Sequence, residues 1–127
     1  MKRHGALVVA IGIILSSGCS RHGNSVSPLT RRPPTVVRIR NSNWLDMTVC
    51  EVRGTARIRL GFVRALGTAT FRVPNASIPD RTLRLLVDPI GSENVYLTDG
   101  VTVAPGQLVE LTIMPSLAMS SLAVWPR

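Results

Sequence analysis

Few side chains of this 127-residue chain are of the types that acid–base or nucleophilic catalysis needs. Its two histidines, His4 and His22, both precede residue 35, so the rest of the chain has no imidazole for a Ser-His-Asp or Cys-His arrangement. Two neighbouring carboxylates could still hydrolyse a glycosidic bond. The candidates are Asp46, Glu51, Asp88, Asp99 and Glu110, and surface ion pairs with the many arginines explain them more simply. We therefore expect no catalytic residues and no cofactor.

The segment Asn41-Ser42-Asn43-Trp44-Leu45-Asp46 is rich in oxygen-bearing side chains. Together with Asp88 or Asp99 from another loop, these oxygens could bind calcium. The alternative is turn chemistry, because Asn and Asp side chains accept hydrogen bonds from backbone N–H groups nearby in such loops. We favour the turn and keep Asp46, Asp88 and Asp99 as weak calcium candidates. A zinc site, which would depend on Cys50 and carboxylates alone, is not expected.

The formal net charge of +8 is unevenly distributed. Five of the fifteen basic residues precede residue 35, whereas the later part has ten arginines and all seven acidic residues, a net charge of +3. A stripe of outward arginines could contact lipid headgroups or an anionic polymer; a solvated face that protects sheet edges is the alternative. With five aromatic residues there is no stacking platform for nucleic acid. The stripe would consist of Arg38, Arg40, Arg57 and Arg59, extended by Arg64, Arg72 and Arg84.

The N-terminal segment has the pattern of an export signal. Basic residues precede an apolar run from Ala6 to Leu15, which at about 1.5 Å per residue is too short for a hydrocarbon core of ~30 Å. Leu15-Ser16-Ser17-Gly18-Cys19 then resembles the lipobox of bacterial lipoproteins, although Ser16 stands where a leucine is usual. The resemblance implies a signal peptide over 1–18 and a lipid anchor on Cys19. Ordinary secretion and a retained signal anchor are the alternatives.

The lipobox resemblance also implies a location in the cell. The residue after the cysteine is Ser20 and not the aspartate that commonly retains lipoproteins in the inner membrane. We therefore expect a protein of the cell envelope that faces the periplasm or the exterior, with the outer membrane favoured in a two-membrane cell. Residues 19–34, rich in Ser, Arg and Pro, are predicted to form a disordered tether with a reach of roughly 20 Å. Cys50 is then left as a lone, buried and inert thiol; a Cys19–Cys50 disulfide is the rival if Cys19 carries no lipid.

Residues 35–127 have the pattern of one all-β domain. Short β-branched runs alternate with turn residues and predict seven or eight strands, with a bulge or bend at Gly61 and a type II turn at Ala104-Pro105-Gly106. Trp44, Ile58, Val52 and Leu122 are among the expected core residues. The predicted strands are 35–40, 47–53, 57–63, 68–73, 82–87, 95–103 and 107–114, with an edge strand at 117–125.

The strand pattern resembles the small antiparallel β-sandwich modules of bacterial envelope lipoproteins, broadly immunoglobulin-like or transthyretin-like. The turn at Val103-Ala104-Pro105-Gly106-Gln107 and the following run Val109-Glu110-Leu111-Thr112-Ile113 carry this resemblance. It implies a fold and transfers no functional residue. The sequence thus favours a non-catalytic lipoprotein with a binding or structural domain, which contacts the membrane and an envelope protein or anionic polymer. The alternatives are a calcium- or carboxylate-dependent carbohydrate binder or hydrolase, and an accessory subunit of an envelope assembly.

Overall fold

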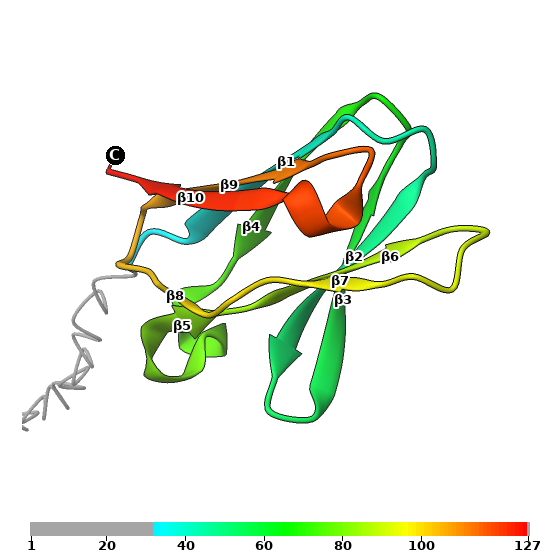
Figure 1. The fold of residues 1–127 in the computed structure, drawn as a ribbon. Coiled ribbons are helices and arrows are strands. Elements are labelled where there is room, and N and C mark those ends of the chain that lie inside the picture. Colours follow the sequence, from blue (N-terminus) through cyan, green and yellow to red (C-terminus); the bar gives the residue numbers. More distant parts are fainter. Residues whose placement is uncertain (1–31, 127) are drawn as a thin grey trace, which may run out of the picture.

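The computed structural model describes residues 32–126, which form a β-sandwich (Figure 1). The predicted signal peptide, Cys19 and most of the predicted tether lie outside the described residues. Within residues 32–126, no helix is long and apolar enough to cross a membrane. The predicted all-β class is confirmed, because every regular element longer than three residues is a strand.

Two four-stranded sheets make up the sandwich. Sheet A has the order β10-β9-β1-β4 and sheet B the order β3-β2-β6-β7, while β5 and β8 pair separately. The strands are β1 (Thr35–Asn41), β2 (Met47–Arg53), β3 (Ala56–Val63), β4 (Thr68–Val73), β5 (Thr82–Leu83), β6 (Leu85–Pro89), β7 (Tyr96–Leu97), β8 (Val101–Thr102), β9 (Leu108–Ile113) and β10 (Ser121–Trp125). Short 3-10 turns, η1 (Asn75–Ser77), η2 (Pro79–Arg81) and η3 (Leu117–Met119), complete the chain.

The pairing of β1 with β9 differs from the predicted all-antiparallel arrangement. These two strands are parallel, with Val37 opposite Val109 and Ile39 opposite Leu111. The other strand pairs are antiparallel, and β10 lies at the edge of sheet A as predicted. Because almost seventy residues separate β1 from β9, no hairpin constrains their relative direction.

Two predicted strands are each divided in two, which gives ten strands in place of eight. The predicted strand 82–87 changes partner at Arg84: β5 pairs with β8, whereas β6 joins β2 in sheet B. The predicted strand 95–103 is likewise interrupted at Asp99-Gly100, between β7 and β8. The predicted limits of β2 and β4 match the structure.

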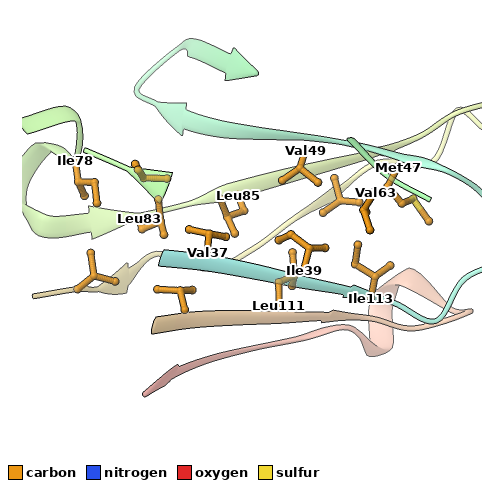
Figure 2. Packing of buried hydrophobic residues seen from close by; sticks show 14 residues of the cluster. Val37, Ile39, Met47, Val49, Val63, Ile78, Leu83, Leu85, Leu111 and Ile113 are labelled. Atoms are coloured by element: carbon orange, nitrogen blue, oxygen red, sulfur yellow. The ribbon is translucent and has the colours of Figure 1, made fainter. Parts of the chain in front are cut away.

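The core lies between the two sheets (Figure 2). Val37 and Ile39 of β1 face the other sheet together with Leu111 of β9, and Val49 and Leu85 cover them from sheet B. Strand alternation explains this selection, since positions 35, 37, 39 and 41 of β1 are buried, whereas Arg38 and Arg40 between them are exposed. Removal of these aliphatic side chains from water is the main stabilising contribution that the sandwich offers.

Trp44 and Ile58, both predicted as core residues, are exposed. Trp44 lies in the loop between β1 and β2 with 74% of its surface exposed. Ile58 is on the inward side of β3, but the end of the β2–β3 hairpin extends beyond the opposite sheet (Figure 1), and four consecutive residues from Ala56 are exposed. Val52 and Leu122, also predicted for the core, are only half-buried.

The predicted irregularity at Gly61 and the predicted turn at Gly106 are both confirmed. The β2–β3 register shifts between Val49 and Cys50, so that β3 has one extra residue next to Gly61. A Cβ atom on Gly61 would lie 2.5 Å from Phe71 Cε1, which explains why a glycine stands here. The Gln107 N–H donates to the Ala104 carbonyl, and Gly106 has the positive φ of 81° that a type II turn requires.

Candidate binding surface at the loop end

Four loops meet at the end of the sandwich that lies away from residue 32 and the C-terminus (Figure 1). They comprise residues 42–46, 64–67, 90–95 and 114–120. Strand pairing brings them together, because Met47 lies opposite both Val63 and Pro89, and Asn41 lies opposite Ile113. We call this surface the loop end.

The buried side chain of Asn41 connects two of these loops. Its Nδ2 donates to the carbonyls of Leu45 (2.8 Å) and Arg64 (2.9 Å), and its Oδ1 accepts the Asn43 N–H (2.9 Å). With only 3% of the residue exposed, water contributes little to these bonds. Asn41 therefore fixes the loop 42–46 against the loop 64–67.

Asn43 extends the same network to a third loop. Its Nδ2 donates to the Pro115 carbonyl (2.9 Å) and to the Met114 carbonyl (3.3 Å), while its Oδ1 accepts the Leu45 N–H (3.0 Å). The Leu66 N–H also donates to the Asn43 carbonyl (3.0 Å). Each asparagine thus uses both its donor and its acceptor, which preorganises the backbone of three loops.

Asp46 belongs to this network and ties the fourth loop to it. Its Oδ1 accepts the Ala65 N–H (2.8 Å), and its backbone carbonyl accepts the Ile90 N–H (2.8 Å). Asp46 therefore holds the loops 64–67 and 90–95 to the start of β2. The local turn chemistry that the sequence favoured over calcium binding is found at Asn41 and Asn43, whose side chains accept the N–H two residues further on, whereas the contacts of Asp46 are long-range.

Large apolar side chains project from this rigid backbone. Trp44, in the first of the four loops along the chain, is 74% exposed. Met119, in the last of them, is 72% exposed. A hollow of about 600 Å³ lies among the loops 42–46, 90–95 and 114–120. Its lining includes Trp44, Leu45, Pro89, Val95, Pro115 and Leu117, and the further exposed apolar residues of the loops are Leu66, Ile90 and Met114.

The three calcium candidates do not share one loop cluster. Asp46 has the contacts described above, Asp88 is exposed on β6 opposite Thr48, and Asp99 is exposed between β7 and β8. Within residues 32–126, no group of three His, Cys, Asp or Glu residues is close enough to hold a metal ion. The amide oxygens of Asn41 and Asn43, which a calcium site would use, accept backbone N–H groups.

Six of the seven arginines of the predicted stripe are divided between two opposite surfaces. Register places Arg38, Arg40 and Arg72 on the outer face of sheet A, whereas Arg57, Arg59 and Arg84 are on the outer face of sheet B. Arg64 belongs to the loop end. Arg38 Nη1 lies 3.5 Å from Glu110 Oε2, an exposed ion pair of little energetic weight.

Glu51 and Cys50, neighbours on β2, point to opposite sides of sheet B. Glu51 is 2% exposed and accepts two hydrogen bonds from Arg53, at 2.9 and 2.8 Å. This hydrogen bonding raises the pKa of the Arg53 guanidinium. Cys50 is a free thiol on the outer face and is half-buried, and its predicted rival partner Cys19 is outside the described residues.

The chain matches no protein-family model and no curated protein. Its site has to be argued from its own geometry. The sequence anticipated the turn role of Asn41 and Asn43, but it did not predict the long-range contacts of Asp46 or the apolar loop end. The available signal was a set of large apolar residues, such as Trp44 and Ile90, inside segments that otherwise have turn composition.

Proposed function

We propose that the protein is a non-catalytic, membrane-anchored lipoprotein of the cell envelope, whose immunoglobulin-like or transthyretin-like sandwich binds a partner protein through the loop end. The observation that carries this proposal is the combination of a hydrogen-bonded loop scaffold with exposed apolar side chains around a hollow. Exposed apolar side chains gathered on a fixed backbone are typical of protein interaction sites. The scaffold lowers the entropic cost of binding, because the loops are already ordered.

The contacts of the acidic side chains support a binding role over hydrolysis. Asp46 holds a loop, Glu51 is paired with Arg53, and Glu110 is paired with Arg38. Each of these carboxylates thus has a structural partner. Support for the anchor comes from the sequence alone, through the lipobox resemblance at Cys19.

The anchor is tested by the intact mass of the mature protein from the native host. We expect cleavage before Cys19 and the added mass of a diacylglyceryl group on that residue. A mature chain with an unmodified Cys19, or with a Cys19–Cys50 disulfide, would contradict the anchor.

The loop end is tested by site-specific crosslinking in the native host. A photoreactive p-benzoylphenylalanine replaces Val95 at the loop end or, as the control, Thr70 on the outer face of sheet A. We expect one discrete protein adduct from position 95 and none from position 70. Adding Trp44→Ser should reduce the adduct from position 95 at least about tenfold, as loss of a central aromatic contact does. Equal adducts from both positions, or an adduct indifferent to Trp44→Ser, would contradict the proposal.

A further inference from the structure

The outer face of sheet B departs from the pattern of a solvated sheet. Register places Cys50, Leu86 and Leu97 side by side, with Arg59 of β3 at the end of the row. Val52 follows Cys50 on β2, and Phe62 lies in the preceding row, opposite Thr48. Phe62 and Leu97 are exposed, whereas Leu86 is buried. Outward positions of a sheet with one solvated face are normally polar. We call this set, with Arg57, Arg59 and Arg84 around it, the basic apolar face.

The outer face of sheet A provides an internal comparison. Its middle rows consist of polar or small residues: Arg38 lies beside Glu110 and Thr70, and Arg40 lies beside Thr112 and Thr68. It has three arginines, as the basic apolar face does, but its larger apolar residues are confined to one end, around Trp125. The two faces therefore match in arginine number and differ in apolar character.

The arginines of the basic apolar face form no ion pair in the described part of the chain, and the exposed Asp88, which register places on the same face, lies in the row of Phe62 and Thr48. The ion pairs found within residues 32–126 join Arg38 to Glu110 and Arg53 to Glu51. Arg57, Arg59 and Arg84 are exposed, so their charge is available to a ligand. A surface that combines unpaired arginines with half-exposed Phe and Leu side chains is suited to an anionic interface with an apolar interior.

We propose that the basic apolar face docks on the anionic phospholipid surface of a bilayer. The arginines contact lipid phosphates, while Phe62 and Leu97 enter the headgroup region. Each arginine near an anionic bilayer contributes about 1 kcal/mol, which corresponds to roughly a fivefold change in affinity.

The length of the chain before the sandwich favours a bilayer as the occupant. Twelve residues lie between Cys19 and Arg32, and the tether predicted from the sequence would have a reach of roughly 20 Å. A strand of seven residues is about 23 Å long, so a lipid on Cys19 permits the whole face to reach the surface. Here the inference rests on the proposed function. A second copy of the chain is disfavoured as the occupant, because two such faces would oppose arginine to arginine.

The test uses the full chain with Cys19→Ser, in which Cys50 is the one remaining thiol. Because Cys50 lies within the basic apolar face, docking should slow its alkylation by a bilayer-impermeant maleimide. The chain is added to vesicles of phosphatidylcholine alone or with one third phosphatidylglycerol. We expect at least fivefold slower alkylation on the anionic vesicles, reversed by high salt.

Two matched triple variants locate the effect. R57Q/R59Q/R84Q should abolish the protection of Cys50 on anionic vesicles, whereas R38Q/R40Q/R72Q removes the same charge from sheet A and should preserve it. Equal rates on both lipids, or equal loss in both triple variants, would overturn the proposal. Protection by a polyglutamate peptide without protection by anionic vesicles would also overturn it and would assign the face to an acidic protein. These measurements need neither acylation nor the loop end, so their failure is distinct from failure of the proposed function.

Discussion

Asn41→Asp is the sharpest test of the loop scaffold. The substitution preserves the size of the side chain and the oxygen that accepts the Asn43 N–H, but it replaces the Nδ2 donor by an acceptor. That donor now bonds the carbonyls of Leu45 and Arg64, at 2.8 and 2.9 Å, in a residue that is almost fully buried. Two hydrogen bonds are lost, and a carboxylate is placed against two carbonyl oxygens.

The expected cost follows from these contacts. Each lost hydrogen bond lowers the free energy of unfolding by about 1 kcal/mol, and unsatisfied buried groups add about 1 to 3 kcal/mol. We therefore expect Asn41→Asp to lower the free energy of unfolding by about 3 to 5 kcal/mol, measured by urea unfolding of the full chain with circular dichroism. Asn94→Asp makes the same chemical change at an exposed loop position and should cost less than about 0.5 kcal/mol.

A refutation would be clear from the same titrations. If Asn41→Asp cost less than about 1 kcal/mol, the buried amide would not hold the loops together as the structure indicates. Equal costs for Asn41→Asp and Asn94→Asp would show that added negative charge, and not the lost donor, is responsible. Either result would also remove the preorganised scaffold from the argument for binding at the loop end.

Three further predictions concern the rest of the sandwich. Gly61→Ala places a Cβ atom 2.5 Å from Phe71 Cε1 and should lower the free energy of unfolding by about 1 to 3 kcal/mol, with partial recovery on adding Phe71→Leu. Glu51→Gln breaks the ion pair between the buried Glu51 carboxylate and the partly exposed Arg53 guanidinium. We expect it to lower the free energy of unfolding by about 1 to 2 kcal/mol, measured by urea unfolding. The pKa of the Arg53 guanidinium is raised in the folded protein, so the stability that Arg53 contributes is complete below its unfolded-state pKa and is lost only as pH rises through its folded-state pKa. The loss of stability caused by Glu51→Gln should therefore not vary between about pH 7 and pH 9. Millimolar calcium should leave the thermal unfolding midpoint unchanged, and a rise of several degrees would contradict the role of Asp46 as the acceptor that holds the loop 64–67.

Local features of the sandwich could be predicted from the sequence, whereas long-range pairings could not. Alternation and turn residues specify β2, β4 and the turn at Gly106, because these depend on neighbours within a few residues. The parallel pairing of β1 with β9 depends on partners far apart in the chain. The same limit explains the exposure of Ile58. Alternation predicts that Ile58 lies on the inward side of β3, but it cannot show that the opposite sheet does not extend far enough to cover this position.

Prediction of the candidate binding surfaces from the sequence was limited in the same way, because these surfaces also depend on long-range strand pairing. Alternation shows that Arg38 and Arg57 point outward, but strand order is needed to place them on opposite faces. The loop end likewise unites Trp44, Val95 and Leu117 from three loops separated by twenty to fifty residues. The turn hydrogen bonds that Asn41 and Asn43 accept, by contrast, are local, and the sequence favoured them. The bonds from the same segment to residues 64–65 and 114–115 are long-range and were not predicted.

The two proposed surfaces together restrict how the protein would sit at a membrane. If the basic apolar face lies on the bilayer, the strands of sheet B run along the surface, because they lie within that face. The loop end, at one end of those strands, is then directed sideways along the membrane, and the outer face of sheet A points away from it. A partner that contacts Trp44 in this orientation must itself be at the membrane surface. Crosslinks from the loop end should therefore capture a membrane-associated protein, and R57Q/R59Q/R84Q should reduce them although none of these arginines belongs to the loop end.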